Sequence, residues 1–371
     1  MENKPVIVGI TQGDINGIGY EVIIKSLLDN TIFDMIVPVV YGSPKVAAYH
    51  RKALNIENFS FNLVKSPAEA HHKRANIINC LGDDVRVELG KLTAHGGEAA
   101  FIALERAVDD LKAGKIDVLV TAPINKNNIQ SDKFRFPGHT DYLKSKFGVD
   151  DVLMFMISES MRIGVVTGHV PLNKVSELLT VELILGKLIL MNRSLLVDFA
   201  IRKPCIAVLG LNPHAGDNSL LGNEETEKII PAIEKARNEG IMAFGPFSAD
   251  GFFGAGMFKK FDGILAMYHD QGLVPFKALS FETGVNFTAG LPVVRTSPAH
   301  GTAFSIAGKG EASENSFRQA LYLACDIYRN RKMYKEISKN PLKHQEVEAH
   351  PEHVDELPPE LPEMNNSDLL L

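Results

Sequence analysis

The sequence predicts an α/β protein whose largely parallel sheet is flanked by helices. Short apolar runs alternate with amphipathic helical segments through the first 130 residues, and further runs of the same kind follow downstream. A chain of 371 residues, 45% of them hydrophobic, is also long enough to bury a large core. Strands that alternate with helices are typical of βαβ units, in which crossover helices cover the faces of a parallel sheet.

The first third of the chain shows this alternation most clearly. Helices are expected at about Tyr20–Leu28, Pro44–Ala53 and Glu98–Ala113. The last of these helices carries one apolar stripe, made of Phe101, Leu104, Val108 and Leu111. The strands expected in this region are VIVGIT, IVPVVYG, FNLVK, RVELG and DVLVT, in chain order.

Downstream, four apolar runs predict further strands: VLMFMIS, RIGVVTG, CIAVLGL and GILAMYH. The long apolar segment 181–201 contains four charged residues and is too polar to cross a membrane. Its apolar side chains share one helical face, which predicts a buried or subunit-contact helix. These side chains are Ile184, Leu188, Met191 and Leu195. One more helix is expected at Ser316–Arg331.

Composition narrows the functional class. The net charge of −6 comes from the end of the chain, because His344–Leu371 holds eight acidic residues and no lysine or arginine. We expect residues 336–371, rich in acid and proline, to form a disordered tail.

No basic run interleaved with aromatic residues is present, which speaks against a nucleic-acid partner. Three separated cysteines and the lack of a signal-peptide pattern predict a cytoplasmic protein, with small molecules as the partners.

Chemistry concentrates between Met267 and Lys309. This stretch holds several polar side chains among glycines and prolines, a composition that suits loops lining an active site rather than packed helices. Its candidate residues are His269, Asp270, Lys277, Asn286, Arg295, Thr296, Ser297 and His300.

Three histidines follow three apolar runs. His169, His214 and His269 each come at or just after the end of an expected strand. In an open α/β sheet, ligands bind beyond the carboxyl ends of the strands, so the three imidazoles can converge on one divalent metal ion. A single histidine at a strand end is more often a hydrogen-bonded loop residue, and no short metal-binding signature is present. From the pattern alone, a shared metal site and three separate loop histidines are equally supported.

Two loops have the features of an anion site. TAPINK, residues 121–126, ends a strand with a hydroxyl and a lysine, and GHTDYL, residues 138–143, presents His139 and Thr140 before a helix whose first N–H groups are free. Each loop alone is equally well explained as an ordinary turn or helix cap. Together with Lys277 and Arg295 they predict a phosphorylated substrate. The glycines of Gly13–Gly19 lack the GxGxxG spacing, so no Rossmann site is expected.

In these residues and their surrounding motifs, the chain resembles the 4-hydroxythreonine-4-phosphate dehydrogenases, the PdxA family of vitamin B6 biosynthesis. The resemblance runs from about Pro5 to Ile327. It includes TAPINK, GHTDYL, TGHVPL, GLNPHAGDNSLLGNEE, GPFSADGFF, AMYHDQG, GVNFTAGLPVVRTSPAHGTAF and AGKGEAS in the family's order. The chain departs from the family's usual pattern at Gln12, Ile15 and Tyr20, and in DNSLLG after Gly216.

The resemblance implies the two-lobed α/β/α fold of the isocitrate and isopropylmalate dehydrogenases, with a non-Rossmann nucleotide site and a cleft between the lobes. Residues 1–130 and 270–335 would form the nucleotide-binding lobe, and residues 131–269 the substrate and dimerisation lobe. It also implies a homodimer in which both subunits share each active site.

Site residues are implied motif by motif. His169, His214 and His269 would bind one divalent metal ion, of which Zn, Mg, Co, Mn and Ni all remain open. Substrate contacts would come from His139, Thr140, Lys277, Asn286 and Arg295. The loop with His300, Gly301, Thr302 and Gly308 would lie near NAD or NADP. Lys277 and Asp250 are the candidate catalytic residues that take up the hydroxyl proton.

The implied reaction is the oxidation of 4-phosphooxy-L-threonine at C3, followed by decarboxylation to 3-amino-2-oxopropyl phosphate. A related dehydrogenase of 4-phospho-threonate or 4-phospho-erythronate, acting in sugar-acid catabolism, is the nearest alternative. A phosphate acyltransferase and a catalytically silent binding protein are the two others.

Overall fold

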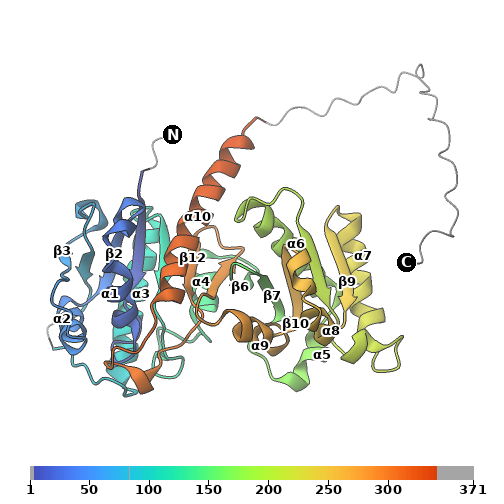
Figure 1. The fold of residues 1–371 in the computed structure, drawn as a ribbon, viewed down its shortest axis with the longest axis horizontal. Coiled ribbons are helices and arrows are strands. Elements are labelled where there is room, and N and C mark those ends of the chain that lie inside the picture. Colours follow the sequence, from blue (N-terminus) through green and yellow to red (C-terminus); the bar gives the residue numbers. More distant parts are fainter. Residues whose placement is uncertain (1–3, 83, 341–371) are drawn as a thin grey trace, which may run out of the picture.

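The computed structural model describes residues 4–82 and 84–340, and one twelve-stranded sheet runs through them (Figure 1). The strand order is β3-β4-β2-β1-β5-β12-β11-β6-β7-β10-β8-β9. Strands from the start and the end of the chain therefore meet in the middle of the sheet, where β5 pairs in parallel with β12. The α/β class predicted from the sequence is confirmed.

One half of the sheet is built by the N-terminal part of the chain. Its strands are β1 (Val6–Thr11), β2 (Ile36–Gly42), β3 (Asn62–Val64), β4 (Asn76–Asn79) and β5 (Val118–Thr121), all paired in parallel. The helices between them are α1 (Gly19–Leu27), α2 (Pro44–Ala53) and α3 (Ala94–Lys112). Ser43 and Thr93 cap α2 and α3 by accepting backbone N–H bonds, which fixes where these helices begin.

The other half is built by β6 (Leu153–Ile157), β7 (Arg162–Thr167), β8 (Cys205–Leu209), β9 (Met242–Phe247) and β10 (Gly263–Tyr268). Helices α4 (His139–Phe147), α5 (Val175–Leu178), α6 (Val181–Val197), α7 (Ile230–Asn238), α8 (Ala249–Gly254) and α9 (His269–Ser280) belong to this part of the chain. Strands β11 (Val285–Ala289) and β12 (Val294–Pro298) then return to the centre, and α10 (Asn315–Ile337) packs against both.

Two central strands reverse the sheet's direction. β6 and β11 pair antiparallel with each other, and they also pair antiparallel with β7 and β12 respectively. The strands at the two ends of the sheet therefore run in opposite senses, and the sheet is mixed rather than parallel throughout. Because it is continuous, the division into residues 1–130 with 270–335 and residues 131–269 stays a prediction.

Most predicted elements are present. The expected helices appear as α1, α2, α3 and α10, and the four side chains predicted to share a face of α6 are fully buried. The strand predicted at RVELG is wrong, since residues 86–90 form no strand. The loops expected across Met267–Lys309 are also partly wrong, because α9, β11 and β12 lie there. Buried apolar residues in these elements, such as Phe276 and Phe287, supply the packing that stabilises them.

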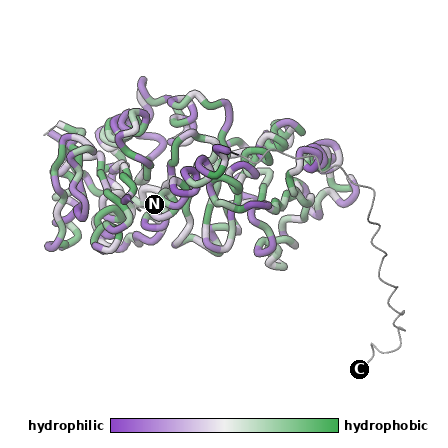
Figure 2. Tube along the Cα trace, turned by 90° about the horizontal axis from the view of Figure 1, so that it is seen from above, coloured by the Kyte–Doolittle hydropathy of each residue, from purple (hydrophilic) through white to green (hydrophobic). Residues whose placement is uncertain are grey.

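The disordered tail predicted for residues 336–371 begins inside α10, and from residue 341 it lies outside the described residues. Figure 2 shows hydrophobic and hydrophilic residues alternating along much of the trace. Within 4–82 and 84–340, no helix is both long and apolar enough to cross a membrane.

The two faces of the sheet are packed differently. On one face a single apolar core extends across both halves and includes buried residues of α1, α6, α7 and α10. On the other face there are two separate clusters, one beneath α3 and α4 and one beneath α8 and α9. The interruption between these two clusters positions the cleft described below.

Close backbone packing joins α3 to the loop that follows β5. A Cβ atom on Gly97 would lie 2.0 Å from the carbonyl oxygen of Asn128. The Asn128 amide also donates to Asp14 Oδ2 at 2.7 Å and to the Thr93 carbonyl at 2.9 Å. This contact holds the loop containing Lys126 against the start of α3.

Replacing Gly97 with alanine should lower the free energy of unfolding, on the order of 1–3 kcal/mol, because backbone rather than a flexible side chain must move. Gly186→Ala is the matched control. It is also a helical glycine, in α6, but its added Cβ meets no atom within 4 Å, so it should stabilise by about 0.5–1 kcal/mol. Urea denaturation of both variants measures the difference, and equal effects would contradict the packing described.

Candidate functional site

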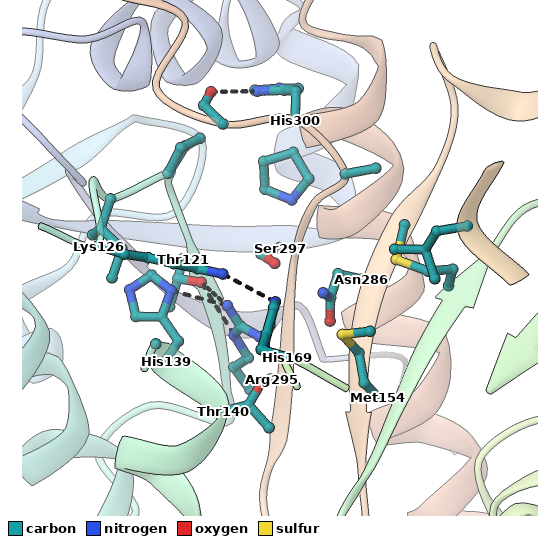
Figure 3. A pocket seen from close by; sticks show the side chains of 18 of the residues that line it. Thr121, Lys126, His139, Thr140, Met154, His169, Asn286, Arg295, Ser297 and His300 are labelled. Carbon is teal, nitrogen blue, oxygen red and sulfur yellow. Dashed lines mark hydrogen bonds between the residues drawn. The ribbon is translucent and has the colours of Figure 1, made fainter. Parts of the chain in front are cut away.

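A cavity of about 260 Å³ opens where the two apolar clusters separate. Its floor is formed by the central strands and its sides by α4 and α9, and Figure 3 shows side chains from both sides pointing into it. Strand positions that would be apolar in a packed core carry polar groups here, among them Asn286 on β11 and Arg295 and Ser297 on β12. The structure brings together nine of the thirteen site residues predicted from the sequence: His139, Thr140, His169, His269, Lys277, Asn286, Arg295, His300 and Gly301.

The central feature of the cavity is a buried arginine. Arg295 is 3% exposed, and burial lowers the pKa of its guanidinium to about 9, so it remains charged at neutral pH. All of its hydrogen-bond acceptors within the described residues are neutral: Thr121 Oγ1 at 2.7 Å, Thr288 Oγ1 at 3.3 Å and His139 Nδ1 at 3.0 Å. Buried charges in proteins are normally paired. Because no carboxylate of the described chain neutralises Arg295, an anionic ligand is the partner that fits.

His139 extends the anion site from the first position of α4. Burial, followed by the charges of Arg295 and Lys126, holds its pKa well below the usual value, so the ring is neutral. Its Nδ1 accepts from Arg295, which assigns the proton to Nε2. That Nε2 is buried without a partner in the described chain and is a donor for a ligand. The uncapped N-terminus of α4 adds backbone N–H groups beside it.

Two lysines complete the positive character of the cavity. Lys126, from the loop after β5, and Lys277, from α9, both line it. Within residues 4–82 and 84–340 neither forms an ion pair, although Asp141 lies near enough to Lys126 to affect its charge state. Partial burial lowers the pKa of Lys126. Three cations thus lie around one cavity without being neutralised by direct carboxylate contacts.

Two of the three predicted metal ligands lie side by side. The rings of His169 and His269 have centroids 5.5 Å apart. Burial, with the charges of Lys126 and His269, lowers the pKa of His169, which favours the neutral form that metals bind. His269 Nδ1 is hydrogen-bonded to Asp270 at 2.7 Å, the carboxylate contact that commonly orients a ligating imidazole. His169 and His269 therefore fit as two of the three predicted ligands of one metal ion.

The third predicted ligand, His214, lies exposed and outside the cavity. In the described part of the chain, no three His, Cys, Asp or Glu residues lie close enough together to hold a metal ion. The physical reason is local, since residues 214–219 all have positive φ and turn the chain away after Asn212. Buried Glu225 supports this segment by accepting the Leu211 and Asn212 amides at 2.7 and 2.8 Å.

Asp250, predicted as catalytic, also lies outside the cavity. It is exposed in α8, and the Ser248 hydroxyl, with smaller contributions from the Gly251 amide and His214, lowers the pKa of its carboxyl. His214 and Asp250 are therefore neighbours on the same exposed surface.

The predicted nucleotide loop borders the cavity with His300 and Gly301. His300 Nε2 is buried without a partner among the described residues. The loop packs tightly on the turn after β1, because a Cβ on Gly17 would lie 2.8 Å from the Thr302 carbonyl oxygen. Thr302 and Gly308 are not among the residues that line the cavity, and a Cβ on Gly308 would clash with the side chain of Leu89.

Several contributing residues had no clear signal of their own in the sequence. Thr288 contacts Arg295 from inside the apolar run VNFTAG, and Met154 and Met156 line the cavity from β6. A fully buried threonine in an apolar strand is a weak signal, because such a hydroxyl normally bonds to backbone.

The chain is similar to known proteins in both sequence and structure. The chain matches the model of the family described as pyridoxal phosphate biosynthetic protein PdxA over residues 34–324. It is 54% identical to a 4-hydroxythreonine-4-phosphate dehydrogenase of Bacteroides thetaiotaomicron, over 94% of this chain and 96% of that protein. It is 39% identical to a D-threonate 4-phosphate dehydrogenase of Cupriavidus necator, over 86% and 97%. The crystal structure of a 4-hydroxythreonine-4-phosphate dehydrogenase from Klebsiella pneumoniae superposes with a TM-score of 0.77 at 33% identity, covering 88% and 99%.

Arg295→Met should remove anion binding without lowering the stability of the ligand-free protein by more than about 1 kcal/mol, because it deletes a buried charge that lacks a counterion. Denaturation with and without inorganic phosphate measures this. Phosphate at about one hundred times its Kd should stabilise the wild type by about 2.7 kcal/mol and leave the variant unchanged.

Arg331→Met is the control for this variant. Arg331 pairs with buried Asp198 at 2.6 Å, so its loss should cost on the order of 3 kcal/mol while the phosphate effect persists. The anion site would be refuted if Arg295→Met kept the stabilisation by phosphate.

Proposed function

Because the chain belongs to the PdxA family of pyridoxal phosphate biosynthetic proteins, we propose that it is a dehydrogenase of 4-phosphooxy-L-threonine, also called 4-hydroxythreonine 4-phosphate. The observation that carries this proposal is Arg295, a buried cation whose neutral contacts leave a place for an anion. The identity of 54% to a relative of that name supports the amino acid as the substrate.

The reaction has two steps, an oxidation followed by a decarboxylation. The C3–H bond of the substrate breaks, its hydride passes to NAD(P)+, and the C3 hydroxyl loses its proton to a base. The resulting 2-amino-3-oxo acid phosphate then loses CO2, and the carbanion left at C2 takes up a proton to give 3-amino-2-oxopropyl phosphate. The protein must therefore hold two anionic ends, orient C3 and accept a proton.

Substrate binding follows from the charges already described. Arg295, the Nε2–H of His139, Thr140 and the N-terminus of α4 bind the phosphate. Lys277, on the α9 side, binds the carboxylate. The buried side-chain oxygen of Asn286, which lacks a partner among the described residues, accepts from the hydroxyl or the ammonium group of the substrate. Fixing both ends of the substrate limits its motion and orients C3 for the transfer.

A divalent metal ion would be held by His169 and His269 of this chain, with His214 as the third ligand. Bound there, it would lower the pKa of the substrate hydroxyl and stabilise negative charge on oxygen in both steps. NAD(P)+ would lie against His300 and Gly301, whose loop also includes Thr302 and Gly308. His300 Nε2 has no hydrogen-bond partner within the described residues, and it would form a hydrogen bond with a polar group of this nucleotide.

Lys277 is the better placed of the two candidate proton acceptors, but only its neutral amine can take up a proton, so this role and binding of the carboxylate by its ammonium are alternatives. It lines the cavity, whereas Asp250 is exposed beside His214. We propose a homodimer whose second subunit brings its own His214 and Asp250 to the cavity, because both residues lie outside the cavity of their own chain. A cytoplasmic location fits the three free cysteines.

The alternatives differ in how well they are supported. The similarity to a D-threonate 4-phosphate dehydrogenase keeps a phosphorylated hydroxy acid as the second candidate substrate. A hydroxyl at C2 in place of the amine leaves the phosphate and carboxylate contacts unchanged. Membership of the PdxA family speaks against a phosphate acyltransferase and against a catalytically silent protein.

The deciding experiment follows NAD(P)H absorbance after the purified protein is mixed with a divalent metal and one substrate at a time. The substrates are 4-phosphooxy-L-threonine, 4-phospho-D-threonate and 4-phospho-D-erythronate, each with NAD+ and with NADP+. We expect the amino acid to give the highest kcat/KM. Turnover of the hydroxy acids alone would replace the proposed substrate, and no turnover of any substrate would refute the proposed activity.

Lys277→Met should lower kcat on the order of 100-fold, because a positioned acid or base typically contributes at least this much. Lys259→Met, an exposed lysine outside the cavity, is the matched control and should behave as wild type. A variant that changed only KM would identify Lys277 as an anchor and not as the proton acceptor.

A further inference from the structure

Lys126 forms an unusual contact at the edge of the cavity. Its Nζ lies 3.0 Å from Nε2 of His169, as the dashed line in Figure 3 shows. A lysine ammonium can only donate, so Nε2 of His169 must accept through its lone pair. This is the same lone pair that a metal ion would use. The ammonium group and a metal ion therefore exclude each other at this nitrogen.

The other side of Lys126 faces the anion site. Its Cε lies 3.7 Å from the position that a Cβ on Gly138 would occupy, at the residue that precedes α4. Beyond Gly138 lie the unpartnered Nε2 of His139 and, bonded to its Nδ1, Arg295. Rotation of the lysine side chain would direct its ammonium, which has no ion pair within the described residues, from His169 toward a phosphate beside His139 at the N-terminus of α4.

We propose that Lys126 couples metal binding to phosphate binding by exchanging partners. Without metal, its ammonium is hydrogen-bonded to Nε2 of His169 and does not bind the phosphate. When a metal ion takes the His169 lone pair, the ammonium is displaced and binds the phosphate group. The inference rests on the proposed function, since it assumes that His169 binds metal and that the cavity binds phosphate.

Coupling of this kind is reciprocal. Phosphate draws Lys126 away from His169, which exposes the imidazole and tightens metal binding by the same factor. A phosphorylated substrate and the metal then assemble the site together. Unphosphorylated threonine analogues lack this effect, so Lys126 contributes to specificity for phosphorylated substrates.

The test titrates inorganic phosphate by calorimetry into metal-free protein and into protein loaded with Mn²⁺ and desalted. Loading should tighten phosphate binding about tenfold in the wild type, within the usual range of coupling energies. Lys126→Met should weaken metal-free phosphate binding only by the loss of one nearby charge, and it should lose most of the tenfold gain that loading gives the wild type. Lys133→Met, an exposed lysine in the same connection between β5 and α4, should match the wild type.

His169→Ala gives the sharper prediction. It releases Lys126 without any metal, so phosphate should bind about tenfold more tightly to the metal-free variant than to the metal-free wild type. The double variant Lys126→Met/His169→Ala should return to the affinity of Lys126→Met. Simple attraction of phosphate by the metal charge predicts neither result.

The exchange of partners would be overturned if metal-free His169→Ala bound phosphate no more tightly than the metal-free wild type. It would also be overturned if loading Lys126→Met with Mn²⁺ tightened phosphate binding as much as it does in the wild type. A wild type that binds no phosphate in either state would instead refute the proposed phosphate site, and the exchange with it. Both outcomes are read from binding alone and do not depend on turnover.

Discussion

The burial of one positive charge without a counterion governs this site. Arg295 is fixed by two threonines and a histidine, all neutral, in the middle of the sheet. Such a charge is costly in the free protein, and the cost is recovered only when an anion binds. Burial, together with the charge of Arg295, lowers the pKa of His139 and keeps its ring neutral, so its Nε2–H is a donor for that anion. The anion site exists before any ligand arrives.

The mixed sheet makes this burial possible. Where β6 and β11 reverse direction, the apolar core on one face stays continuous, and on the other face it separates into two clusters. A fully apolar face in this region would leave no room for a cavity. The polar residues Asn286, Arg295 and Ser297 lie on strands held firmly by the core on the opposite face. Rigid strands are better supports for a binding site than loops.

Much of the fold was predictable, since hydrophobic periodicity predicted the main helices and eight of the twelve strands, and family motifs predicted most of the cavity residues. The sequence alone could not show that β11 and β12 insert between β5 and β6, because long-range pairing leaves no local pattern. RVELG alternates like a strand but forms none, since its Gly90 amide instead donates to the Asn16 carbonyl. The sequence also could not show that His214 lies outside the cavity of its own chain, because strand order predicts where a chain emerges but not the left-handed turn that follows.

That left-handed turn has a consequence for local dynamics. Five of the six residues in 214–219 are not glycine, and each costs on the order of 1 kcal/mol in this conformation. The segment is therefore strained, and the carboxylate of Glu225 anchors its start by accepting the amides of Leu211 and Asn212. Removing that carboxylate would free the residues that lead into the turn and let the turn relax first, while the sheet stays folded. Amide exchange should then show this loop as a separate opening unit, with a free energy far below that of global unfolding.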